Sequence, residues 1–257
     1  LNSLYGAILN PGCRFFDKRI GQSTTLSGRN IARFMSAEVN RIITGEQDHV
    51  GDSIIYGDTD SVYFSAWPII KDAVSKGEME WNKDLCVQLY DNIAEQVNEV
   101  FPRHMKEAFN CPRENGEIIQ GGREIVAIKG LYITKKRYAC LIYDLEGARL
   151  DRDGPGKVKA MGLDLKRSDT PKSIQDFLST ILLGVLTGDD RDTVIEKIRD
   201  FKQDFKHRPA WEKGTPKRWN NLTKFTEEER RQGKANMPGH VRASMNWNTL
   251  KNMNGDK

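Results

Sequence analysis

Two aspartates, separated by a single residue, lie in a short stretch that has apolar residues on both sides. The stretch reads SIIYGDTDSVYF, with the acids at Asp58 and Asp60. Its β-branched and aromatic residues predict two short strands, 54–56 and 61–64, joined by a turn. Carboxylates at a hairpin tip could hold a hard divalent cation, which prefers oxygen ligands. Gly and Asp also favour turns for conformational reasons alone, so both interpretations remain open for this stretch by itself.

A second group of reactive side chains is the run Lys135-Lys136-Arg137-Tyr138. The surrounding residues, 123–143, are rich in β-branched and aromatic types, which predicts strand structure. Three successive cations on a strand would point to both faces, and burying all of them would leave charge without a partner. An anionic partner such as a phosphate backbone would resolve this, whereas a solvated edge strand guarded by lysines is the alternative.

Helical periodicity predicts much of the structure that supports these two stretches. Apolar residues on one face predict a helix over about 24–44 that ends at Gly45. Apolar residues four apart predict another helix over 85–109, which Pro102 would kink or split. Such apolar faces are typical of core packing rather than of a cofactor site.

The last third of the chain is predicted to be helical and then basic. Thr170-Pro171 would cap a helix that ends at Gly188, and a helix over about 192–206 could pair with it in antiparallel fashion. Residues 201–257 contain 13 Lys and Arg against 6 Asp and Glu, although the net charge of the whole chain is only +4. Contact with a polyanion and a solvated basic face would each explain this asymmetry.

Composition limits the classes of protein that fit. With 257 residues, 38% of them hydrophobic, the chain can bury one good-sized core or two smaller ones. No apolar run approaches the roughly 20 residues that a membrane span needs, so no membrane partner is expected. The four cysteines are widely spaced and lack a C-x-x-C pair, so they indicate neither a zinc knuckle nor a disulfide framework.

Three motifs occur in one order along the chain, NSLYG at 2–6, YGDTDS at 56–61 and KKRY at 135–138. In this order they resemble the C-terminal half of family B DNA polymerases, especially the replicative polymerases of T-even-type bacteriophages. Two further stretches, KAMGLD at 159–164 and SDTPK at 168–172, are similar to the start of that group's thumb.

The resemblance implies an α+β fold with three regions. Residues 1–22 would be the end of the fingers helix and its connection. Residues 23–150 would be the C-terminal part of the palm, with an antiparallel β-hairpin that bears the acids and with packed helices. Residues 151–257 would be a mainly helical, incomplete thumb.

The resemblance also implies a reaction and its site. A DNA-directed DNA polymerase, which is a nucleotidyltransferase, transfers a nucleotide from a dNTP to a primer 3′-hydroxyl on primer-template DNA and releases pyrophosphate. Asp60 corresponds to the firm catalytic metal ligand and Asp58 to its supporting acid, at two Mg²⁺ ions. The nascent base pair would be housed by Asn2, Tyr5 and Gly6. The primer strand would be held by Lys135, Lys136, Arg137 and Tyr138.

Several parts of the family pattern are missing from this sequence. The other metal-binding Asp of the family lies in a D-x-x-S-L-Y-P-S type motif, and no such motif occurs here. The chain also opens at Leu1 with neither an initiator Met nor a helix cap, which predicts an element beginning before that residue. We therefore expect little or no activity from this chain alone and a companion N-terminal polymerase segment that completes it. The full enzyme would use a sliding clamp and act in the cytoplasm of a phage-infected bacterium.

Two alternatives compete with this interpretation. A reverse transcriptase also sets acids on a palm hairpin, but typically as two consecutive Asp residues, and it would not explain NSLYG and KKRY. A non-enzymatic DNA-binding or accessory module on a polymerase scaffold would need only the basic region.

Overall fold

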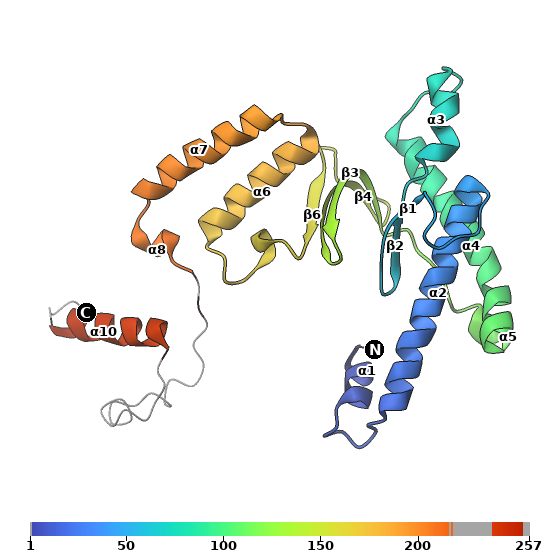
Figure 1. Ribbon diagram of the computed structural model, residues 1–257, viewed down its shortest axis with the longest axis horizontal. Helices are drawn as coiled ribbons and strands as arrows, with labels where there is room; N and C mark the ends of the chain where they lie inside the picture. Colours follow the sequence, from blue (N-terminus) through green and yellow to red (C-terminus); the bar gives the residue numbers. More distant parts are fainter. Residues whose placement is uncertain (1, 216, 218–237, 254–257) are drawn as a thin grey trace. The chain divides into compact units, whose positions relative to one another are not determined.

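The computed structural model describes residues 2–215, 217 and 238–253, apart from a few side chains near the ends of these ranges (Figure 1). Helices and small antiparallel sheets alternate along the chain, which confirms the α+β prediction. The chain divides into two compact units, Leu1–Met161 and Gly162–Lys257. None of the helices in the described ranges is long and apolar enough to cross a membrane.

The first unit contains two long helices and several short ones. Its helices are α1 (Asn2–Leu9), α2 (Lys18–Thr44), α3 (Trp67–Ser75), α4 (Lys83–Phe109) and α5 (Arg113–Gly116). α2 begins six residues earlier than predicted because Asp17 caps it by accepting a hydrogen bond from the backbone N–H of Arg19. Of the two predicted effects of Pro102, a kink or a split, the split is wrong because α4 continues through it as one helix. Phe101 and Met105 are buried on either side of the proline.

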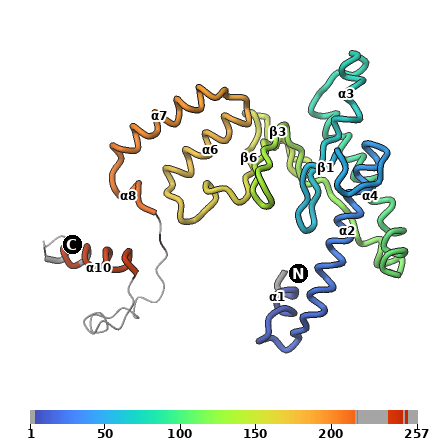
Figure 2. The backbone as a smooth tube through the Cα atoms, viewed as in Figure 1, coloured from blue at the N-terminus to red at the C-terminus, as the bar shows by residue number. Residues whose placement is uncertain are grey.

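All strand pairs in the described residues are antiparallel. Figure 2 traces the backbone through these elements. The strands are β1 (Ile54–Asp58), β2 (Ser61–Phe64), β3 (Ile125–Thr134), β4 (Arg137–Leu145), β5 (Ala148–Arg149) and β6 (Lys157–Met161). β1 and β2 form one hairpin, while β4 pairs with β3, β5 and β6 in a second sheet. β6 therefore belongs to the first unit.

The main core of the first unit lies between the two long helices. Val39 of α2 and Val97 of α4 are buried together with Phe101, whose side chain is 1% exposed. Burying side chains of this size stabilises the fold by about 1.5–3 kcal/mol each. Ile54 and Phe64 pack against the same cluster from the first hairpin. The helix pair therefore supports the strands that carry the two acids.

A buried polar contact holds the loop that leads into β1. The side-chain oxygen of Asn40 accepts hydrogen bonds from the backbone N–H of Ser53 at 3.2 Å and from its hydroxyl at 2.7 Å. The Asn40 amide donates to the carbonyl of Glu46 at 2.8 Å. A Cβ on Gly51 would lie 2.0 Å from the Asn40 amide nitrogen, so glycine is required for this close approach. These contacts determine where the first hairpin starts.

Replacing Asn40 by alanine should destabilise the first unit measurably. Asn40 and Ser53 are 1% and 0% exposed, so the variant leaves buried donors without an acceptor. We expect a loss of about 1–3 kcal/mol in the free energy of unfolding, measured by urea titration. Asn30→Ala, on an exposed face of the same helix, is the matched control. Equal effects of both variants would show that the buried hydrogen bonds contribute nothing specific.

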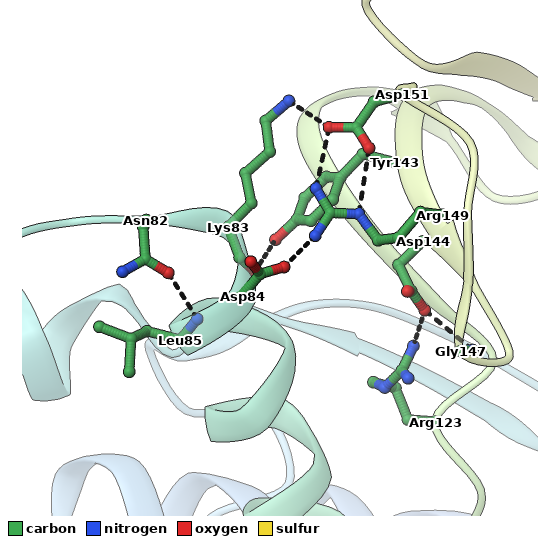
Figure 3. A network of polar contacts seen from close by, with 10 residues as sticks. All are labelled: Asn82, Lys83, Asp84, Leu85, Arg123, Tyr143, Asp144, Gly147, Arg149 and Asp151. Carbon is green, nitrogen blue, oxygen red and sulfur yellow. Dashed lines mark hydrogen bonds and ion pairs between the residues drawn. The ribbon is translucent and has the colours of Figure 1, made fainter. Parts of the chain in front are cut away.

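An ion network joins the start of α4 to the second sheet (Figure 3). Asp151 accepts hydrogen bonds from Lys83 at 2.5 Å and from Arg149 at 3.0 Å, and Arg149 also contacts Asp84. Arg149, and after it Lys83, lowers the pKa of Asp151 to about 2. Asp151 is therefore ionised at neutral pH and joins the turn after β5 to α4.

The second unit is helical in its described residues. Its elements are the 3₁₀ turn η1 (Asp164–Lys166) and the helices α6 (Lys172–Thr187), α7 (Arg191–His207), α8 (Ala210–Lys213) and α10 (Gly239–Met253). Phe177 of α6 stacks on Phe201 of α7 with ring centroids 3.8 Å apart. Gly188 ends α6 with φ +110°, as predicted. The predicted Thr170 cap is wrong, because its hydroxyl donates to the carbonyl of Asp164 and α6 begins after Pro171.

Candidate active site

The two acids lie at the tip of the first hairpin. Asp58 is the last residue of β1 and pairs with Ser61, the first residue of β2, so Thr59 and Asp60 form a two-residue turn. Asp60 is exposed, while the Asp58 side chain is only 27% exposed and accepts a hydrogen bond from the Thr59 hydroxyl at 3.1 Å. The two carboxylates therefore differ in environment, with Asp60 the more accessible to solvent and to a ligand.

The basic motif lies at the tip of the second hairpin. Thr134 pairs with Arg137, which makes Lys135 and Lys136 the two-residue turn between β3 and β4. The expectation that all three cations lie along a strand is therefore wrong, and only Arg137 is part of one. Lys136 adopts φ +61°, a left-handed conformation that costs a non-glycine residue about 1 kcal/mol. This strained turn needs support from neighbouring residues.

Side chains of the two hairpins hold their tips together. The backbone N–H of Lys136 donates to the Tyr56 hydroxyl at 2.9 Å, across 80 residues of sequence. The hydroxyls of Tyr63 and Tyr138 are hydrogen-bonded at 2.9 Å. As a result, the Lys136 ammonium lies 4.0 Å from a carboxylate oxygen of Asp58. The acidic and the basic motif thus form one site.

Four tyrosines form the contact between the hairpins, and only Tyr138 was among the predicted site residues. The rings of Tyr56, Tyr63, Tyr132 and Tyr138 have centroids 5.3–5.8 Å apart. Burial raises the pKa values of Tyr63 and Tyr132, so both remain neutral hydroxyls. Tyrosine recurs within a few residues of both the acidic and the basic motif. This recurrence is the sequence signal that could have identified the other three tyrosines.

No family model matches the chain. It is 31% identical over 196 residues to the DNA-directed DNA polymerase of Escherichia phage RB69, covering 72% of this chain and 21% of the relative. It is 25% identical over 217 residues to that of Enterobacteria phage T4, covering 80% and 23%. The DNA polymerase alpha catalytic subunit of Mus musculus is 22% identical over 198 residues, covering 77% and 11%.

The chain is a relative of the family B DNA polymerases of T4-like phages. This confirms the resemblance inferred from the three motifs. The chain spans about a fifth of the length of these phage polymerases.

The first motif of this polymerase relative lies on α1. The Tyr5 hydroxyl is hydrogen-bonded to that of Thr25 on α2 at 2.8 Å, and a Cβ on Gly6 would meet no atom within 4 Å. Among the described contacts, none joins Tyr5 to either hairpin tip. The side chain of Asn2 lies outside the part of the chain that the structure describes. The predicted base-pair contacts of these three residues stay predictions.

The carboxylates of this polymerase relative suit a hard cation but supply only part of its ligands. Mg²⁺ takes six oxygen ligands, commonly one or two carboxylates together with water and substrate phosphates. Asp58 and Asp60 are donors of this kind. Among the described residues, no group of three or more His, Cys, Asp or Glu side chains could hold a metal ion. The two acids therefore fit Mg²⁺ if further oxygen ligands come from substrate, water or another segment.

Replacing Tyr56 by phenylalanine should loosen the basic turn. The variant keeps the ring contacts and removes the acceptor of the Lys136 N–H, at a cost of about 0.5–1.5 kcal/mol. We expect faster hydrogen exchange of the Lys136 amide, measured by NMR or mass spectrometry. Tyr90→Phe is the matched control, because the Tyr90 hydroxyl bonds to the backbone of Ala66 and Phe64, at and after the end of β2 and away from the basic turn. Unchanged Lys136 exchange in Tyr56→Phe would contradict this role.

Proposed function

We propose that this chain supplies part of the active site of a template-directed DNA polymerase. The reaction forms a bond between a primer 3′-oxygen and the α-phosphorus of a dNTP and breaks the bond to pyrophosphate. The observation that carries the proposal is the contact between the two hairpins, in which Lys136 lies 4.0 Å from Asp58. An acidic tip beside a basic turn provides ligands for a cation and contacts for phosphates in one place. The similarity to phage DNA-directed DNA polymerases supports the same conclusion.

The acids have different proposed roles. Asp60, exposed at the tip, is the metal ligand, and Asp58 supports it while contacting Lys136. The proposed cofactor is a pair of Mg²⁺ ions shared with an Asp that this sequence does not contain. When bound, such ions supply charge neutralisation at the phosphates and a more acidic primer hydroxyl.

The other site residues hold nucleic acid. In this proposal Lys135, Lys136 and Arg137, at the tip of the second hairpin, bind primer phosphates, which positions a strand without reading its bases. Tyr138 anchors that turn through its bond to Tyr63. The nascent base pair is assigned, from the resemblance alone, to Asn2, Tyr5 and Gly6.

The proposed organisation follows the family resemblance of the three motifs. Residues 1–22 are assigned to the end of the fingers, 23–150 to the palm and 151–257 to the thumb. A companion polymerase segment completes the enzyme, and a sliding clamp is its further partner. The proposed place of action is the cytoplasm of a phage-infected bacterial cell.

Primer extension tests the proposal. The chain is assayed alone and mixed with a polypeptide made of the RB69 polymerase residues that precede its matched segment, with Mg²⁺ and dNTPs. We expect extension only in the mixture. Extension by the pure chain would refute the need for a companion, and the absence of extension from every mixture would count against the polymerase role.

A non-enzymatic DNA-binding module is the second candidate, favoured by the exposed turn Lys135-Lys136, which could bind phosphates without a metal. Phosphate binding weakens steeply with salt, so duplex affinity should fall between 50 and 200 mM salt under either candidate. Mg²⁺-dependent extension is expected only for the polymerase.

A further inference from the structure

Aromatic rings continue the core beyond Phe101 where α2 packs on α4, and one of them belongs to a histidine. The His104 ring of α4 is stacked on the Phe34 ring of α2, with centroids 3.7 Å apart and planes 5° from parallel. Phe109, the last residue of α4, lies perpendicular to the His104 ring at a centroid distance of 6.0 Å. Phe34 also contacts Phe101, which is 1% exposed. His104 is therefore part of the apolar contact between the two long helices.

The His104 ring has a polar atom without a partner in this contact. Its Nε2 atom is buried, and none of the described residues forms a hydrogen bond with it. A neutral imidazole needs a proton on only one nitrogen, so Nδ1 can hold it and Nε2 remains a bare acceptor. A second proton would make Nε2 a buried donor without an acceptor and would add charge to the ring. Because the two rings are parallel, the Nε2–H bond would point away from the face of Phe34.

On α4 and the neighbouring α5, little charge compensates a protonated ring. Glu107 is the carboxylate that acts on His104, and it favours the protonated form, but its side chain is 68% exposed. The other charged residues in the last two turns of α4 and at α5 are exposed as well: Arg103, Lys106, Arg113, Glu114 and Glu117. Solvent screens exposed charges, so their influence on the buried nitrogen is weak.

On α2, the charged residues within one turn of Phe34 are Arg33 and Glu38. Arg33 is exposed, and the buried Glu38 accepts a hydrogen bond from Arg41 at 2.9 Å. Burial is therefore the largest influence on His104 and lowers its pKa below the ordinary value of 6.5, while the charge of Glu107 raises it by less.

We propose that His104 makes the packing of α2 on α4 sensitive to acid. The neutral ring stays between Phe34 and Phe109, whereas a protonated ring leaves the stack for water and loosens the helix pair that supports the acidic hairpin. A group that binds its proton less readily in the folded than in the unfolded chain makes folding less favourable in acid. The stabilisation is therefore complete above about pH 6.5 and is lost as the pH falls below that value. All three rings lie in the first unit of this chain, so the effect does not depend on the proposed polymerase role.

Hydrogen exchange of the full 257-residue chain between pH 7.5 and 5.5 tests this acid sensitivity. The measured quantity is the factor by which amides of residues 34–43 and 93–105 exchange more slowly than in an unstructured peptide at the same pH. A single titrating group can change this protection by at most about tenfold over the range. We expect protection in the unmodified chain to fall about three- to tenfold more than in His104→Phe, whose ring keeps the stack but cannot titrate. An equal fall in both chains would overturn the proposal.

His49→Gln is the matched control, because it removes an exposed histidine from the same unit. We expect its protection to fall with pH as in the unmodified chain. If His49→Gln abolished the fall as completely as His104→Phe, the assignment to His104 would be wrong.

NMR titration of the unmodified chain is a second test, which does not require any variant to fold. The His104 ring protons are identified by their nuclear Overhauser contacts with Phe34. We expect the ring to take up its proton at a lower pH than a histidine in an unfolded peptide. Uptake at the same or a higher pH would refute the proposal.

Discussion

Asp60→Asn should abolish primer extension by the mixture of this chain and its companion polypeptide. The side chain keeps its size but loses the charge that attracts a divalent cation. Without metal-based stabilisation of the transition state, the activation free energy rises by several kcal/mol. This corresponds to a rate reduction of about 10³-fold or more. Single-turnover extension at saturating dNTP measures this effect.

Two further variants make the Asp60 result interpretable. Asp58→Asn should reduce the rate less, by about 10- to 100-fold, because this carboxylate has a supporting role. Asp52→Asn removes an exposed carboxylate from the loop before the same hairpin and should leave the rate unchanged. Asp60 is exposed, so the free energy of unfolding of Asp60→Asn should equal that of the unmodified chain. An extension rate of Asp60→Asn within tenfold of the rate of the unmodified chain would exclude Asp60 as the metal ligand.

The largest expected effect on stability belongs to Arg123. Its guanidinium donates a hydrogen bond to Asp144 at 2.5 Å and also contacts Asp91 (Figure 3 shows the pair with Asp144). The side chains of Arg123 and Asp144 are 10% and 2% exposed. Arg123→Met leaves the buried Asp144 carboxylate with the backbone N–H of Gly147 as its hydrogen-bond donor. Removing one partner of a buried pair costs about 3–5 kcal/mol, which denaturant unfolding can measure.

Two variants are the controls for Arg123→Met. One changes its buried partner Asp144, and the other breaks an exposed ion pair. Asp144→Asn retains an oxygen that accepts hydrogen bonds, and Arg123 keeps Asp91, so a smaller loss of about 1–2 kcal/mol is expected. Arg113→Met breaks the exposed pair between Arg113 and Glu117 and should not change stability measurably. A loss from Arg123→Met no larger than that from Arg113→Met would show that the buried ion pair does not stabilise the fold.

The sequence alone predicted most of the local structure. The apolar stripes of α2 and α4, the stop at Gly45 and the first hairpin depend on neighbours in the chain, and their residue types indicate them directly. The turn of the second hairpin at Lys135 and Lys136 was instead predicted to be strand. The family resemblance was also readable, because NSLYG, YGDTDS and KKRY are short and contiguous. The predicted helix starts were less accurate. Asp17 begins α2 through a capping hydrogen bond that apolar periodicity does not specify, and α6 begins after Pro171 without a side-chain cap.

Only the tertiary structure brought the two motifs together. Tyr56 and Lys136 are 80 residues apart, and nothing in their local patterns required a hydrogen bond between them. Local patterns determined which elements form, whereas contacts between distant elements determined which side chains share a site.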